Sequence, residues 1–381
     1  LVCYAKSMLW NELATPVALV DRDKVIKNTS HMSERMVSLG VKMRPHVKTH
    51  KCVEAARLQT RGHFGGITVS TLAEARAFGR AGFKDITYSV PIASVRLEEA
   101  INLTRDLEQF NLLLDHEMTL VHMERCSKQN ATPLSIFLKV DCGYHRAGVD
   151  PNADESVKLA MRIADSPHVL FKGILTHAGH SYEGGDRKSV EAIAAIEREV
   201  MVSFGEKLRS VGITNFDVSI GSTPTMSVVD SLVGIDEVRP GNYVFYDSFQ
   251  AMIGSCSIED AAYSVLVSVI GMYPSRNELL IDGGALAFSK DQGPSHIDSR
   301  CGYGRIFSED GQSLDDLRLV SLSQEHGKIK AEGQNGLDNC FVGMKLRIIP
   351  NHSCLSAALF ERYYVVEGRE VVEEWLPVHG W

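Results

Sequence analysis

Apolar and polar positions alternate in a regular rhythm along residues 15–268. Short runs rich in β-branched residues are followed by longer stretches in which apolar residues recur every three or four positions, as in strands and amphipathic helices respectively. Strands are expected at residues 17–20, 42–45, 66–70, 86–89, 111–115, 136–141, 171–176 and 216–220, with helices such as 72–82 and 190–211 between them. Eight strands, each followed by a helix, predict an α/β fold of the TIM-type (β/α)8 barrel class.

The rhythm changes after residue 268. Strand-like runs at residues 279–281, 317–320, 345–349, 363–366 and 371–375 are separated by turn signals and show little helical periodicity. This pattern is typical of antiparallel strands. We therefore expect a barrel domain over residues 15–268 and a C-terminal antiparallel β domain over residues 269–381, to which residues 1–14 can be added.

A basic segment follows the second expected strand. Residues 44–51 read RPHVKTHK, so Lys48 lies among Arg44, Lys51 and two imidazoles. Catalytic residues of such barrels follow the carboxyl ends of the strands. Cationic neighbours favour the free amine of a lysine, the form that adds to a carbonyl as a Schiff base. The alternative is a solvated basic turn.

Two short loops rich in small residues also follow apolar runs. Residues 221–225 (GSTPT) and 239–242 (RPGN) offer backbone N–H groups and hydroxyls. Loops of this kind bind phosphate at the mouths of barrels. Beside a nucleophilic lysine they indicate a phosphorylated, carbonyl-bearing cofactor, which describes pyridoxal phosphate.

Other polar clusters are candidates of lower specificity. His352 and Cys354 are two positions apart, so on an extended strand both side chains point to the same side and could share zinc, with open positions for water or substrate. The alternative is a cysteine buried as a small hydrophobe. His177 and His180 are three apart on an expected loop, where such a pair is more often structural. Residues 323–327 (SQEHG) read best as a surface turn.

Composition excludes several classes of partner. The formal net charge of −8 is spread along the chain, which argues against nucleic acid and anionic membranes, because both favour basic patches. No apolar stretch is long enough to span a bilayer, and residues 1–14 lack the apolar core of a signal peptide. The 8 cysteines are scattered, without the spacing of a disulfide scaffold, which favours a reducing compartment and a cytoplasmic location.

Together these segments resemble the pyridoxal-phosphate family that contains D-serine dehydratase and D-threonine aldolase, whose barrel is like that of alanine racemase. The resemblance covers nearly the whole chain. It is carried by residues 44–51, 69–72 (VSTL), 85–89 (DITYS), 139–143 (KVDCG), 146–148 (RAG), 177–182 (HAGHSY), 241–243 (GNY), 273–276 (YPSR), 323–327, 350–354 (PNHSC) and 375–377 (WLP).

The resemblance implies roles for individual residues. Lys48 matches the Schiff-base lysine and α-proton base, and His352 with Cys354 matches the metal pair, with zinc expected and manganese or another divalent ion as alternatives. His177 and His180 are the further catalytic candidates. The implied cofactor-binding residues are Lys48, Arg146 at the phenolic oxygen, Arg239 at the pyridine nitrogen, His177 and Tyr182 beside the ring, and Ser222, Thr223, Gly241 and Asn242 at the phosphate.

The implied function is a metal-dependent lyase of D-3-hydroxy amino acids. The His-x-Cys pair is similar to that of D-serine dehydratases, whereas the aldolases compared with it have His-x-Asp, so conversion of D-serine to pyruvate and ammonia is expected. D-threonine aldolase, D-threo-3-hydroxyaspartate dehydratase and a non-catalytic pyridoxal-phosphate-binding protein are the alternatives. A homodimer is expected by analogy.

Overall fold

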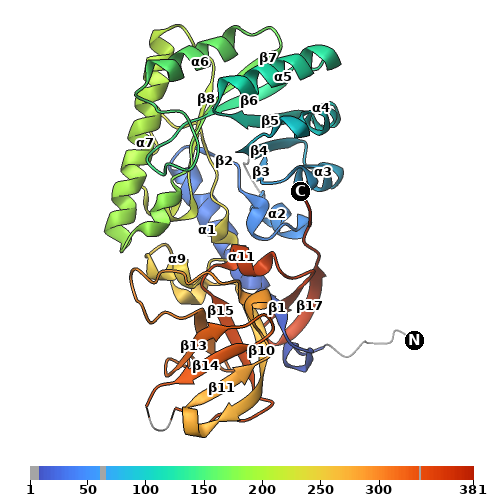
Figure 1. The fold of residues 1–381 in the computed structure, drawn as a ribbon, viewed down its shortest axis with the longest axis vertical. Helices are drawn as coiled ribbons and strands as arrows, with labels where there is room; N and C mark the ends of the chain where they lie inside the picture. Colours follow the sequence, from blue (N-terminus) through green and yellow to red (C-terminus); the bar gives the residue numbers. More distant parts are fainter. Residues whose placement is uncertain (1–7, 61–65, 334–335) are drawn as a thin grey trace, which may run out of the picture. The chain divides into compact units, whose positions relative to one another are not determined.

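A computed structural model describes residues 8–60, 66–333 and 336–381. The chain divides into two compact units (Figure 1). The barrel unit comprises residues 31–241 and 378–381, and the β unit comprises the residues up to 30 together with 242–377. The division therefore differs from the expected boundary at residue 268, because residues 15–30 and 242–268 belong to the β unit.

The barrel unit is built on eight parallel strands in the order β2-β9-β8-β7-β6-β5-β4-β3. A parallel bridge between His46 and Thr68 joins the two ends of this order, which confirms the TIM-type fold. The strands are β2 (Lys42–Met43), β3 (Ile67–Val69), β4 (Asp85–Pro91), β5 (Gln109–Leu114), β6 (Leu134–Lys139), β7 (Val169–Leu175), β8 (Asp217–Ile220) and β9 (Glu237–Val238).

Helices follow the barrel strands and lie outside them (Figure 1). The helices are α1 (Arg22–Ser38), in which the division between the units falls, α2 (Val53–Gln59), α3 (Leu72–Arg80), α4 (Leu97–Asp106), α5 (Glu117–Asn130), α6 (Asp154–Asp165), α7 (Arg187–Ser210) and α8 (Thr223–Val228). Helices α3, α5, α7 and α8 begin where a polar side chain caps the free N–H groups of the first turn. Thr71 accepts from the backbone of Glu74, and Asp186 forms a capping box with Ser189.

One expected barrel strand belongs elsewhere. Residues 17–20 form part of β1 (Val17–Asp21), which pairs antiparallel with β10 (Tyr263–Tyr273) and parallel with β16 (Tyr363–Glu367) in the β unit. Its three middle residues are buried, and a short buried strand shows the same apolar run in either kind of sheet. The missing barrel strand is β9, which has only two residues and contains the charged Glu237, so it gives no apolar run.

The β unit contains a mostly antiparallel nine-stranded sheet, as expected for the C-terminal region. Trp10, Leu13, Leu19, Leu266 and Val366 form one buried cluster of its core. The remaining strands are β11 (Glu278–Ile281), β12 (Gly304–Phe307), β13 (Leu317–Leu322), β14 (Gly327–Ala331), β15 (Lys345–Pro350) and β17 (Glu370–Trp375), with short helices α9 (Ser248–Met252), α10 (Ala285–Phe288) and α11 (Ser353–Ala357). The expected surface turn at residues 323–327 lies between β13 and β14.

Two further expectations concern membrane-spanning segments and disulfide bonds. Within the described residues, no helix has the length and apolarity needed to cross a membrane. The seven cysteines in this part of the chain form no disulfide with one another, and Cys3 lies outside the described residues.

Candidate active site

Lys48 follows a barrel strand, as predicted. The chain leaves β2, forms the bridge at His46 and enters a short 3-10 turn, Val47–Thr49, that carries the half-buried lysine. The turn is capped by His46, whose Nδ1 accepts from the backbone N–H of Lys48 at 3.3 Å. Lys48 therefore lies at the carboxyl end of the strands, where barrel enzymes carry their chemistry.

His46 is a site residue that the sequence reasoning did not single out. Burial and the nearby Lys48 lower the pKa of His46 well below its usual range, so the ring is neutral at pH 7. Because Nδ1 accepts a hydrogen bond, the proton lies on Nε2, which is 3.0 Å from the Ser89 hydroxyl. The sequence could have indicated His46, because it lies two residues before Lys48 in the same motif.

The two cations that flank Lys48 in the sequence are neutralised. Arg44 Nε lies 2.7 Å from the buried Glu237, and its two terminal nitrogens contact Asp85 at 2.6 and 2.9 Å. Lys51 Nζ lies 3.1 Å from Glu74. Each of these two cationic neighbours is therefore paired with a carboxylate, which the sequence motif did not show.

Other basic side chains lie near His177. Burial lowers the pKa of His177 well below its usual range, and the charges of Lys48, Lys139 and Arg146 add to this effect. Burial, together with the charge of Arg239, lowers the pKa of Lys139 to about 7. Basic side chains from several strand ends thus lie around His177, an arrangement that suits an anionic ligand.

The loop after β7 carries His177, His180 and Tyr182. The ring centroid of Tyr144 lies 6.3 Å from that of His177 and 6.1 Å from that of His180, where it stacks. A Cβ atom at Gly179 would lie 2.2 Å from the Tyr144 ring, so only glycine leaves room for it. Tyr144 is a second residue that the motif analysis passed over, and Arg146 lies over its ring.

The loops after β8 and β9 contain the candidate phosphate ligands. Ser222 caps α8, and its hydroxyl is 3.0 Å from that of Ser181. The Thr223 hydroxyl accepts from the backbone N–H of Gly241 at 3.3 Å, so the two loops are joined. A Cβ atom at Gly241 would lie 2.8 Å from the carbonyl oxygen of His46, so the close approach of this loop requires glycine.

Arg239 is buried between neighbouring strands. It donates to the Ser219 hydroxyl and to the backbone carbonyl of Thr176, and burial lowers its pKa to about 10. Arg239 is also one of the charges that act on His46. Its position near the cofactor stays a prediction.

His352 and Cys354 come together in the β unit, but not on an extended strand as expected. β15 ends at Pro350, His352 is the N-cap residue of α11, and Cys354 lies within that helix. The imidazole and the thiol are hydrogen-bonded to each other. Burial opposes the charge on this ring, yet hydrogen bonds to Asp291 and Cys354 raise the pKa of His352 to about 10.

Two further residues contact this pair. His352 Nδ1 lies 3.1 Å from Asp291 Oδ2, and Asn242 Nδ2 lies 3.5 Å from the Cys354 sulfur. Asn242 Nδ2 also lies 2.7 Å from the buried Asp247. The side-chain amide of Asn242 thus faces the His352–Cys354 pair. Only the backbone of Asn242 remains for its predicted role at the phosphate. In the described part of the chain no third His, Cys, Asp or Glu completes a metal cluster.

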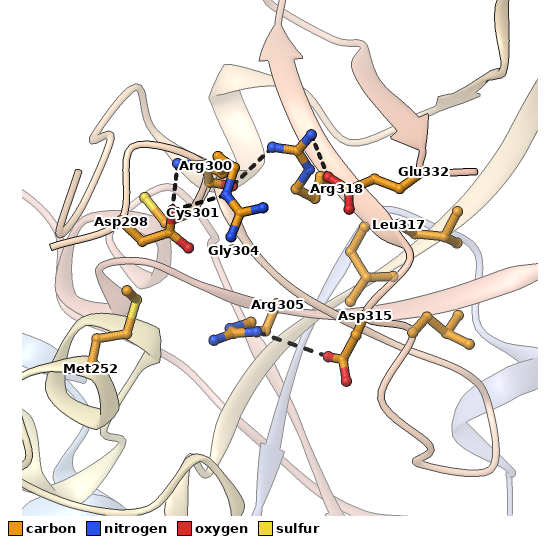
Figure 2. Close-up of a pocket in the computed structure, with 12 residues that line it drawn as sticks. Met252, Asp298, Arg300, Cys301, Gly304, Arg305, Asp315, Leu317, Arg318 and Glu332 are labelled. Carbon is orange, nitrogen blue, oxygen red and sulfur yellow. Dashed lines mark hydrogen bonds and ion pairs between the residues drawn. The ribbon is translucent and has the colours of Figure 1, made fainter. Parts of the chain in front are cut away.

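A pocket of about 140 Å³ in the β unit contains none of the predicted residues (Figure 2). Its three arginines each face a carboxylate, with Arg318 lying 2.5 Å from Glu332. Positive and negative groups therefore balance, and the pocket offers no excess charge to a ligand.

Known proteins resemble this chain over its whole length. The alanine racemase N-terminal domain model matches residues 20–248, and the serine dehydratase domain model matches residues 262–366. A D-serine dehydratase of Dictyostelium discoideum is 38% identical, over 97% of this chain and 98% of the relative. A D-threo-3-hydroxyaspartate dehydratase of Delftia sp. is 36% identical, over 97% and 98%. The solved structure of a cysteine-to-alanine mutant of a D-threo-3-hydroxyaspartate dehydratase, in the metal-free form, has a TM-score of 0.94 at 34% identity and covers 98% of this chain and 100% of that one.

Proposed function

The chain belongs to the family in which an alanine racemase N-terminal domain is followed by a serine dehydratase domain, and we propose that it is a pyridoxal-phosphate- and metal-dependent D-serine dehydratase. The family expectation from the sequence is confirmed, and with it the class of enzyme, a lyase of D-3-hydroxy amino acids. The observation that carries the proposal is the convergence of Lys48, Lys139 and Arg146 on His177 beside two joined phosphate-type loops.

The barrel-unit residues fit pyridoxal phosphate. The cofactor is an anion with an aldehyde, so it needs a lysine, unpaired positive charge and backbone that can approach closely. Lys48 supplies the amine, and the loops of Ser222, Thr223 and Gly241 supply hydroxyls and a glycine held against the His46 carbonyl. These residues would hold the phosphate, with Arg146 at the phenolic oxygen.

The β-unit pair fits a divalent ion such as zinc. A thiolate and an imidazole are ligands that zinc prefers, and two protein ligands leave positions open for water and substrate. His352 Nδ1 faces Asp291, so Nε2 is the ring nitrogen left for an ion, as in carboxylate–histidine–zinc arrangements. His352 and Cys354 would hold the ion.

The chain's own groups then have defined tasks. Lys48 Nζ removes the proton from the α carbon, and the neutral His46 holds the Lys48 turn through its Nδ1. When bound, pyridoxal phosphate supplies an electron-accepting ring and the metal supplies a Lewis acid for the poor leaving group, the β-hydroxyl. Loss of the α proton and of hydroxide from D-serine, followed by hydrolysis, gives pyruvate and ammonia.

Aldol cleavage is the second candidate, because His180 has a buried Nδ1 atom with no hydrogen-bond partner among the described residues. Such a nitrogen can take the proton of a β-hydroxyl, after which the Cα–Cβ bond of D-threonine breaks to glycine and acetaldehyde. His177 is less suited, since its Nδ1 lies 3.3 Å from the Gly221 carbonyl oxygen.

Product analysis separates the candidates. The zinc-loaded enzyme is incubated separately with D-serine, D-threonine and D-threo-3-hydroxyaspartate, and pyruvate, 2-oxobutanoate, oxaloacetate, glycine and aldehydes are measured. Pyruvate from D-serine is expected as the fastest product. Glycine and aldehyde alone would refute the dehydratase assignment. Oxaloacetate formed faster than pyruvate would show that D-threo-3-hydroxyaspartate, and not D-serine, is the preferred substrate.

The attachment residue is tested directly. Borohydride reduction followed by peptide mass analysis should place the cofactor on the peptide that contains Lys48, and the Lys48→Ala variant should yield no labelled peptide. Label on another lysine would remove Lys48 from this role. The homodimer and the cytoplasmic location stay predictions, the former open to measurement of the mass in solution.

A further inference from the structure

Glu197 is a buried carboxylate at a position where α7 otherwise presents apolar residues. The buried side of this helix consists of Val190, Ala194, Glu197, Met201, Phe204, Gly205 and Leu208. Glu197 is fully buried, and acidic residues are almost never buried without partners. A charged residue in the middle of an apolar stripe therefore calls for a specific contact.

The contacts of Glu197 lie on two loops of the candidate site. Its Oε1 atom accepts from the backbone N–H of Ala178 at 3.1 Å and from that of Gly221 at 3.0 Å. Ala178 directly follows His177, and Gly221 directly precedes Ser222. One carboxylate oxygen thus joins the histidine loop after β7 to the phosphate-type loop after β8.

Two weaker links join the same loops. His177 Nδ1 lies 3.3 Å from the Gly221 carbonyl oxygen, and the Ser181 hydroxyl lies 3.0 Å from that of Ser222. Both links are made by neutral groups. The Glu197 carboxylate differs, since the two buried N–H groups are left without this charged acceptor if it is removed.

We propose that Glu197 is a positioning residue that holds the His177 loop and the Ser222 loop in one arrangement, so that the second loop can bind the cofactor phosphate. The inference rests on the proposed function, because it concerns pyridoxal phosphate. Glu197 touches neither cofactor nor substrate in this scheme. It acts through Ala178 and Gly221.

Three substitutions test the proposal. Glu197→Gln keeps an oxygen that accepts both N–H groups, Glu197→Asp keeps the charge but withdraws the oxygen by one methylene, and Glu197→Ala removes the acceptor. The control is Met201→Ala, one turn further along the same buried stripe, which leaves a cavity but removes no hydrogen-bond acceptor of the Ala178 and Gly221 N–H groups. For each variant, the dissociation constant of pyridoxal phosphate is measured by titrating the apoprotein, and the melting temperature is measured in parallel.

Glu197→Asp and Glu197→Ala should each weaken cofactor binding by about tenfold or more, while Glu197→Gln stays within about threefold of the parent. Met201→Ala should lower the melting temperature with the dissociation constant within about twofold. Parent-like affinity in Glu197→Asp overturns the proposal, as does a Met201→Ala variant that loses the cofactor equally, or a glutamine variant as weak as the alanine. If the parent itself does not bind pyridoxal phosphate, the proposed function fails instead.

Discussion

Removing the carboxylate of Asp291 should weaken metal binding without removing a ligand. Asp291 lies outside the His352–Cys354 pair, but its Oδ2 atom lies 3.1 Å from His352 Nδ1. That contact holds the ring so that Nδ1 faces the carboxylate, which leaves Nε2 as the nitrogen that would bind an ion once its proton is displaced. In Asp291→Ala the ring loses this partner and can rotate or place its proton on Nε2.

The size of the effect follows from the removal of a single charge-assisted hydrogen bond. Loss of such an outer partner typically reduces metal affinity about 10- to 100-fold, or about 1.4–2.7 kcal/mol. Asp291→Asn keeps an oxygen that can accept from Nδ1 but carries no charge. Its affinity should therefore lie between those of the parent and the alanine variant.

The measurement is the zinc dissociation constant of the cofactor-loaded protein, determined by competition with a chromogenic chelator. Asp298→Ala is the matched control, because Asp298 is a partly exposed aspartate of the same segment that contacts Arg300 and not His352. The control should bind zinc within about twofold of the parent. An Asp291→Ala variant with parent-like zinc affinity would show that the carboxylate does not orient the ligand.

Three other substitutions have outcomes set by burial. Between pH 7 and 10.5 the unfolded chain holds a proton on Lys139 that the folded apoprotein lacks, since burial lowers the pKa of this lysine to about 7 from 10.5. The free energy of unfolding should thus rise with pH in this window by up to about 1.4 kcal/mol per unit, and Lys139→Met should remove that slope in urea titrations. Arg44→Met removes the guanidinium that contacts the buried Glu237 and should cost about 3–5 kcal/mol in the same titrations. Gly179→Ala would place a Cβ atom 2.2 Å from the Tyr144 ring, so turnover should fall sharply with little change in urea midpoint.

Each of these has an outcome that contradicts it. Equal pH slopes in the parent and Lys139→Met would mean that the lysine keeps its proton in the folded protein. An Arg44→Met loss below about 1 kcal/mol would show that Glu237 finds another partner. Full turnover in Gly179→Ala would show that the Tyr144 ring can move without consequence.

The regular part of the barrel could be read from the sequence because its strands are apolar runs buried on both sides. Seven of the eight barrel strands lie where such runs predict them. β1 was assigned to the wrong sheet, since its burial is the same in the centre of either one. β9 was missed because its two residues include Glu237, which pairs with Arg44, the residue after β2, 193 positions away in the sequence.

The sequence motifs of the candidate site were predictable, whereas the residues that hold those motifs in position were not. Lys48, His177 and Ser222 stand in short polar segments directly after strands, so local pattern finds them. The contact of Asp291 with His352 joins residues 61 positions apart, and that of Glu197 with Gly221 crosses from a helix to a loop. Only folding brings these partners together, and nothing local in the sequence announces the pairing.

Two residues that hold the site in position did have a local signal, however. Each is a charged residue at a position where the apolar pattern of its helix or strand predicts a buried apolar side chain. Glu197 occupies a core-facing position of a helix whose other buried residues are apolar or glycine, and Glu237 occupies a buried strand. A protein tolerates a charge at such a position only where specific partners compensate for its desolvation. Both carboxylates contact elements of the barrel mouth, one through Gly221 and the other through Arg44. In this fold, charged residues at apolar positions of a predicted helix or strand are therefore the places from which to search for residues that hold the active site in position.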